Sequence, residues 1–167
     1  MFRNVDCSFL VHFCSRWQPP AVGSLKINFH SAFSKSSGVG IGGLCSLVRN
    51  DRGELLDGLT TRMVAGFPFD AEVKAAKLVC SLGVDYKGVK IEFEGGSKLL
   101  TNLVVGKTLL GSKWTARSLM DEIKLSLGEL RAGYSWTHCA KTGNMAASYF
   151  SSRLCENEFI EGMQWVG

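Results

Sequence analysis

Three consecutive strand patterns separated by short turns constrain the possible fold of this chain more than any other feature. Residues 25–30 alternate between an apolar side, with Leu25, Ile27 and Phe29, and a polar side that ends at His30. This alternation is typical of a half-buried strand. Apolar strand patterns over 39–50 and 54–63 follow after turns at 34–38 and 51–53. Because short turns join antiparallel neighbours, residues 25–63 are predicted to form a three-stranded meander.

The apolar period then changes, and this change predicts helices that pack on the sheet. Residues 69–86 have helical spacing, with Asp70 as the predicted N-cap. Later patterns predict a strand, a short helix, an amphipathic helix, a strand and a final helix, over 89–94, 97–105, 118–130, 133–140 and 143–154 in that order. The order β-β-β-α-β-α-α-β-α predicts an α/β fold in which helices flank a mixed sheet of five strands.

Composition indicates a single globular domain of ordinary polarity. The chain has 167 residues, of which 46% are hydrophobic and 20% charged, and its net charge of +4 slightly favours anionic partners. No apolar run approaches the ~18 residues that a membrane span needs. No signal peptide is recognised at the N-terminus, and the scattered cysteines fit reduced thiols. We therefore expect a monomeric protein of the cytoplasm or nucleus that is not secreted.

Two possible ligand motifs are better explained in other ways. Gly38, Gly40 and Gly43 spell G-x-G-x-x-G, but the dinucleotide-binding motif leads directly into a helix. Here a strand pattern follows, so we interpret these glycines as permitting a bend or a close backbone approach. Cys7, His12 and Cys14 lie near one another in sequence, but their spacing fits no usual pair of metal ligands.

Several short motifs occur in an order that points to a known family. They are a tryptophan followed by two prolines at 17–20, the glycine-rich second strand, R-x-D-R-G at 49–53, A-E-x-x-A at 71–75 and a histidine–asparagine–alanine pattern at 138–147. With these motifs, residues 17–154 resemble the plant ribonuclease-H-like domain that is related to those of non-LTR retrotransposon reverse transcriptases. The resemblance implies a ribonuclease-H-like domain over 17–155, between an unassigned segment (1–16) and a tail (156–167).

The resemblance also implies where a catalytic site would lie. The family hydrolyses RNA paired with DNA, using two Mg²⁺ ions that are held on four carboxylates. The matching segments NFHSA, AEVKA, EGGS and NMAAS place those carboxylates at His30, Glu72, Gly96 and Ser148. Glu72 is the one acid that matches, so it is the predicted remnant of the catalytic site and at most a weak metal ligand. His30, Gly96 and Ser148 are interpreted as degenerate positions.

Replacement of three acids should remove most of the attraction for Mg²⁺. A charge pair at about 4 Å is worth ~4 kcal/mol gross at an effective dielectric constant of about 20. An imidazole at position 30 suits zinc or nickel better than magnesium. No cofactor is expected, and Mg²⁺ is expected only if acids such as Glu94 or Asp70 form a shifted site.

Nucleic-acid binding depends on a wider surface and is expected to outlast catalysis. The segment from Lys98 to Met120 has four basic residues and no acid, and a tryptophan among cations is typical of a surface that follows a nucleic-acid backbone. HCAKTGN resembles the family's H-x-x-R-x-x-N, although a lysine lacks the planar fork of arginine. A solvated loop and a helix cap are the alternatives. The predicted contacts are Lys107, Lys113, Trp114, Arg117, His138, Lys141 and Asn144.

The sequence thus predicts a ribonuclease-H-like pseudoenzyme derived from a retroelement. It would bind RNA–DNA hybrids or double-stranded RNA weakly, by shape rather than by sequence. Two alternatives stay open. One is an active Mg²⁺-dependent hybrid endoribonuclease with shifted ligands, and the other is an interaction module or retroelement remnant without nucleic-acid affinity.

Overall fold

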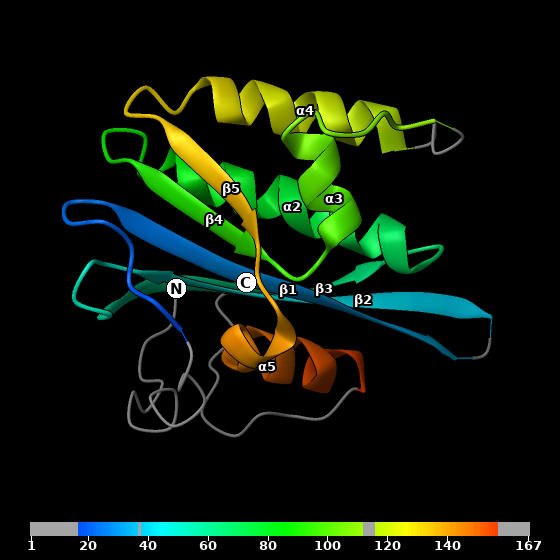
Figure 1. The fold of residues 1–167 in the computed structure, drawn as a ribbon. Helices are drawn as coiled ribbons and strands as arrows, with labels where there is room; N and C mark the ends of the chain where they lie inside the picture. Colours follow the sequence, from blue (N-terminus) through cyan, green and yellow to red (C-terminus); the bar gives the residue numbers. More distant parts are fainter. Residues whose placement is uncertain (1–16, 37, 112–115, 157–167) are drawn as a thin grey trace.

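A mixed sheet of five strands with helices on both faces forms the fold (Figure 1). The computed structural model describes residues 17–36, 38–111 and 116–156. The strands are β1 (Leu25–Ser36), β2 (Val39–Arg49), β3 (Leu55–Val64), β4 (Ile91–Gly95) and β5 (Tyr134–His138). The helices are α2 (Pro68–Val84), α3 (Lys98–Val104), α4 (Arg117–Gly128) and α5 (Met145–Cys155), with a 3₁₀ turn, η2 (Lys141–Gly143), before α5. The predicted fold class and order of elements are confirmed.

The strands lie in the order β3-β2-β1-β4-β5. The pairs β1–β2 and β2–β3 are antiparallel, which confirms the meander, whereas β4 and β5 are parallel to β1. β1 continues beyond the predicted end at residue 30, because its pairing with β2 extends to Ser36 opposite Val39. The predicted turn at 34–38 is therefore wrong in length.

The main core lies between the sheet and the helices above it in Figure 1. Ile27 and Phe29 of β1 belong to this core with Phe93 of β4, and α2 packs on β1 while α4 packs on α2. α5 covers the opposite face, where Cys45 and Phe150 belong to a smaller cluster. Since the apolar residues of β1 alternate, one side of this strand faces the main core and the other faces α5.

The polar side of β1 is buried, although the sequence pattern indicates only that it is polar. Lys26 and Asn28 are 3% and 1% exposed. The Lys26 Nζ and the Asn28 Nδ2 each donate to a different carboxylate oxygen of Glu94, at 2.7 Å in both cases. Trp17 closes this cluster, because its Nε1 donates to Asn28 Oδ1 at 2.6 Å. These contacts join β1, β4 and the segment that precedes β1.

The start of α2 differs from the prediction. The N-cap is Phe67, and Pro68 takes the first helical turn, a position that suits proline because it needs no backbone donor there. Asp70 is not the N-cap, so that prediction is wrong. Its carboxylate instead accepts from the Gly66 N–H at 2.8 Å and from the Lys74 Nζ at 2.9 Å.

The glycines of β2 allow helices to approach the sheet closely. No helix follows the G-x-G-x-x-G motif, because β2 runs on to Arg49. A Cβ atom on Gly43 would lie 2.4 Å from the Ser151 carbonyl oxygen in α5, and one on Gly42 would lie 3.0 Å from the Ala71 Cβ in α2. The predicted close backbone approach is confirmed.

We expect Gly43→Ala to lower the free energy of unfolding by about 2 kcal/mol, because α5 must move away from β2 to admit the methyl group. Chemical denaturation measures the change. Gly128→Ala in α4 is the matched control, since a Cβ there meets nothing within 4 Å, and it should be neutral or stabilising. Equal effects of the two substitutions would contradict the close-approach explanation.

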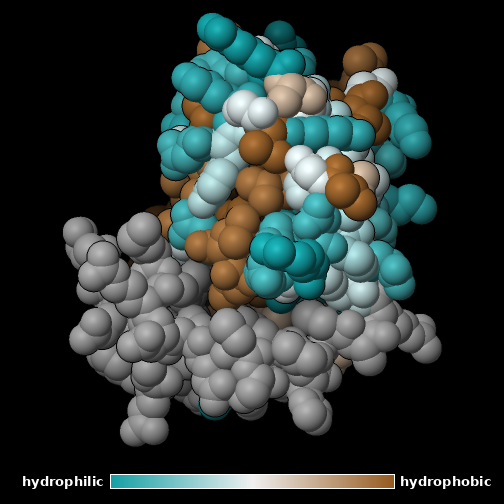
Figure 2. Space-filling model, turned by 90° about the vertical axis from the view of Figure 1, so that its left-hand side faces the viewer, coloured by the Kyte–Doolittle hydropathy of each residue, from teal (hydrophilic) through white to brown (hydrophobic). Residues whose placement is uncertain are grey.

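The described surface at one end of the molecule is mostly polar, and none of the described helices is suited to crossing a membrane. At the end of the molecule where β4 begins, the described surface is largely hydrophilic around a band of apolar groups (Figure 2). Within the described part of the chain, no helix has the length and apolar character that crossing a membrane requires. The predictions for residues 1–16, including Cys7, His12 and Cys14, lie outside the described residues.

Candidate functional site

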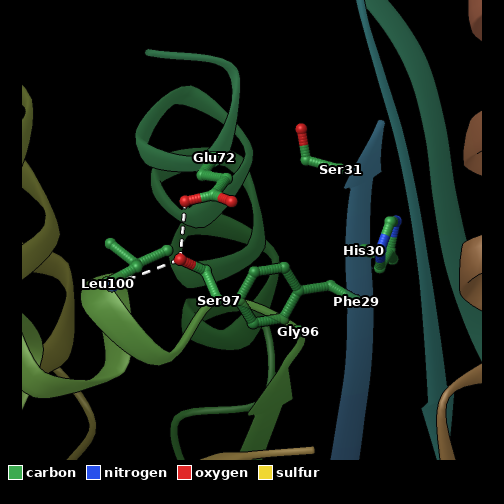
Figure 3. Close-up of a pocket in the computed structure, with 7 residues that line it drawn as sticks. All are labelled: Phe29, His30, Ser31, Glu72, Gly96, Ser97 and Leu100. Carbon is green, nitrogen blue, oxygen red and sulfur yellow. Dashed lines mark hydrogen bonds between the residues drawn. The ribbon is translucent and has the colours of Figure 1, made fainter. Parts of the chain in front are cut away.

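Three of the four positions that the family uses for acids line one pocket. His30 comes from β1, Glu72 from α2 and Gly96 from the residue after β4, and the pocket is completed by Phe29, Ser31, Ser97 and Leu100 (Figure 3). A Cβ on Gly96 would lie 3.1 Å from His30 Cδ2, so these two positions are adjacent. Ser148 does not line the pocket, although it is linked to His30 through α5.

His30 is attached to α5 by a hydrogen-bond chain. Its Nδ1 lies 2.9 Å from Ser151 Oγ, and this hydroxyl donates to the Ser148 carbonyl oxygen at 3.0 Å. Because the Ser151 proton is already used, the Ser151 oxygen accepts from His30 Nδ1–H, and His30 Nε2 carries the lone pair. Burial, and secondly the positive charge of Lys141, lower the pKa of His30. The imidazole is therefore neutral at neutral pH.

Glu72 is half-buried and has a local partner. Its Oε2 accepts from Ser97 Oγ at 2.5 Å, and the same hydroxyl oxygen accepts from the Leu100 N–H at 3.3 Å as the N-cap of α3. Glu72 thus connects α2 to the start of α3. Figure 3 shows Glu72 and His30 on opposite sides of β1.

The nearby acids that could replace the missing ligands are engaged elsewhere. Glu94 is paired with Lys26 and Asn28, and Asp70 is paired with Lys74. Among the described residues, no group of three or more histidine, cysteine, aspartate or glutamate side chains could hold a metal ion. A pair of Mg²⁺ ions needs several oxygen ligands that the two ions share. Glu72 is the one carboxylate that lines this pocket, so these residues do not fit the pair of ions that the family uses.

The predicted nucleic-acid contacts differ in exposure. Lys107, Arg117, His138 and Lys141 are exposed, and Lys141 is close enough to influence His30. Lys113 and Trp114 lie outside the described residues.

Asn144 is buried, and its Nδ2 donates to the Phe29 carbonyl oxygen at 2.7 Å. It occupies the N-cap position of α5 but makes no side-chain capping bond. Its side chain therefore ties the start of α5 to β1, just before His30.

Three serines complete the site that motif matching identified only in part. Ser97 and Ser151 are the direct partners of Glu72 and His30. Ser31 Oγ is buried and has no hydrogen-bond partner in the described structure. A serine before a helical pattern signals the N-cap role of Ser97, but no sequence signal links position 151 to position 30.

The fold of this chain is similar to solved structures, whereas comparisons of its sequence find no match. No protein-family model and no curated protein matches the chain. The RNase H1 of Halobacterium salinarum is 14% identical, with a TM-score of 0.67 over 79% of this chain and 98% of that one. LC11-RNase H1 in complex with an RNA/DNA hybrid is 14% identical, with a TM-score of 0.53 over 76% and 94%.

The foamy viral protease–reverse transcriptase in complex with an RNA/DNA hybrid is also similar. It is 12% identical, with a TM-score of 0.64, and the match covers 83% of this chain and 21% of the viral protein. These similarities show that the chain has a ribonuclease-H-like fold.

Proposed function

We propose that this domain binds nucleic acid, with RNA–DNA hybrids or double-stranded RNA preferred, and does not hydrolyse it. The observation that carries the proposal is the composition of the pocket. Glu72 is the single carboxylate among its seven lining residues, whereas the family's reaction needs two ions on shared carboxylates. The other two acids nearby, Glu94 and Asp70, are held in ion pairs.

The binding part of the proposal is supported by exposed basic groups and by the fold. The charge of Lys141 acts on His30, Lys107 lies between α3 and α4, and Arg117 begins α4. Two proteins of similar structure were studied in complex with RNA/DNA hybrids. Weak contacts between such cations and phosphates do not depend on the base sequence, and they release counterions. Binding should therefore be independent of sequence and sensitive to salt.

A labelled RNA–DNA hybrid tests both parts. In EDTA, we expect measurable binding at about 50 mM salt and at least tenfold weaker binding at about 200 mM. Lys141→Gln should weaken binding and reduce the salt slope by about one. Lys87→Gln, which removes an exposed lysine near the start of β4, is the control and should change little.

Cleavage is tested by adding Mg²⁺ or Mn²⁺ to the same complex. We expect the hybrid to stay intact. Cleavage that Glu72→Gln abolishes would favour the alternative of an active endoribonuclease with shifted ligands. Absence of binding at low salt would instead favour the alternative of an interaction module or retroelement remnant.

The biological setting forms part of the same proposal. A plant retroelement origin rests on the motifs between residues 17 and 154, and a monomer in the cytoplasm or nucleus is the expected form. The scattered cysteines and the modest positive charge support this setting.

A further inference from the structure

His30 offers a fixed hydrogen-bond acceptor to the pocket. Its Nδ1–H is used by Ser151, whose own proton goes to the Ser148 carbonyl oxygen. The remaining ring nitrogen, Nε2, lies 3.6 Å from where a Cβ on Gly96 would stand. Because glycine leaves that space open, Nε2 can be reached by a group that enters the pocket beside Gly96.

Among the other polar groups of the pocket, Glu72 favours a ligand that donates hydrogen bonds, and the Ser31 hydroxyl can either donate or accept. Glu72 keeps one carboxylate oxygen after Oε2 has accepted from Ser97. Ser31 Oγ is buried without a partner in the described structure, and it lies on the Glu72 side of β1 (Figure 3). None of the seven lining residues is a lysine or arginine. A phosphate group would bring only acceptors and negative charge to this pocket, and both are disfavoured beside Glu72.

We propose that His30 Nε2 accepts a hydrogen bond from a ribose 2′-hydroxyl of the RNA strand, so that the degenerate site recognises RNA without a metal ion. This inference rests on the proposed function and adds a chemical contact to recognition by shape. The 2′-hydroxyl is the group by which a protein distinguishes RNA from DNA at a given site. A neutral imidazole with its lone pair directed outward suits such a donor, whereas a phosphate oxygen has no proton to give.

Three duplexes of one sequence test the inference in EDTA. They are an RNA–DNA hybrid, the same hybrid with 2′-fluoro sugars in the RNA strand, and duplex DNA. Fluorine keeps the RNA-like sugar geometry but removes the donor. We expect the native protein to bind the RNA hybrid about 3–10-fold more tightly than the fluoro hybrid, the range that one hydrogen bond supplies.

Two variants assign this preference to a residue. His30→Leu should reduce the ratio between the RNA and fluoro hybrids to about one, because it removes the acceptor but keeps a side chain of similar bulk. Tyr134→Leu is the control. It removes an exposed polar ring at the start of β5 that does not line the pocket, so it should leave the ratio between the two hybrids unchanged.

The outcomes separate this inference from the proposed function. Equal affinity of the native protein for the RNA and fluoro hybrids would overturn the hydroxyl contact and leave nucleic-acid binding intact. A preference that persists in folded His30→Leu would overturn the role of His30. No binding to any of the three duplexes at low salt would overturn both proposals. If His30→Leu fails to fold, the native protein still decides the question of the hydroxyl.

Discussion

The triple variant His30→Asp, Gly96→Asp, Ser148→Asp is expected to gain Mg²⁺ affinity and to become strongly dependent on that ion for stability. Ser148 is 3% exposed, and His30 and Gly96 are neighbours in space. The new carboxylates, two of which would share the pocket with Glu72, would repel one another in a partly buried region. Without metal, we expect the free energy of unfolding to fall by about 3 kcal/mol or more.

Thermal unfolding with and without Mg²⁺ measures this gain. An ion at about 100 times its dissociation constant should return about 2.7 kcal/mol, whereas the native protein should show little change. Calorimetric titration of the folded variant would give the stoichiometry directly. A triple variant that folds but shows no Mg²⁺-dependent stabilisation would contradict the prediction that carboxylates at these four positions can share Mg²⁺.

The single variant Gly96→Asp is the control for geometry. Its Cβ would lie 3.1 Å from His30 Cδ2, so the two side chains compete for the same space. It should therefore be destabilising regardless of Mg²⁺. Shortening of His30 to aspartate in the triple variant relieves this contact, so the two variants separate steric from electrostatic effects.

Glu94→Ala is expected to destabilise the fold severely, with a loss of about 3–5 kcal/mol in the free energy of unfolding. Removal of this carboxylate leaves the Lys26 ammonium, on a side chain that is 4% exposed, and the Asn28 amide without their shared partner. Glu92 lies 3.6 Å from the Lys26 Nζ, so it compensates only in part. Urea denaturation gives the change.

Arg52→Ala is the matched control for the loss of an ion pair. Arg52 and Glu54 lie 2.9 Å apart, but their side chains are 74% and 54% exposed, and such surface pairs contribute about 0–1 kcal/mol. If Glu94→Ala cost no more than Arg52→Ala, the buried cluster of Lys26, Asn28 and Glu94 would not be a stabilising joint between β1 and β4.

The order of the elements could be predicted because it depends on local patterns. The alternation over 25–30 and the helical spacing over 69–86 each describe one element and its own two faces. What the sequence did not show depends on partners far along the chain. β1 extends to Ser36 because β2 pairs with it, and the burial of Lys26 depends on Glu94, which lies 68 residues later.

The candidate site was predictable only where motif matching applied. The alignment of short motifs identified His30, Glu72 and Gly96, and the structure brings all three to one pocket. The partners of these residues have no such motif. Ser151 lies 121 residues from His30, and a serine within a helix carries no sign of what it contacts. Asn144 matched a family position, but its burial against Phe29 could be seen only in the folded chain.

The attachment of α5 to β1 has a consequence for synthesis of the protein. β1 is synthesised before the other described strands and helices, whereas residues 145–155, which cover its face opposite α2, follow all of them. The hydrogen bonds that join the two span 115 and 121 residues. Until translation reaches α5, the nascent meander presents an uncovered apolar surface, a state that favours association with chaperones or with other unfinished chains.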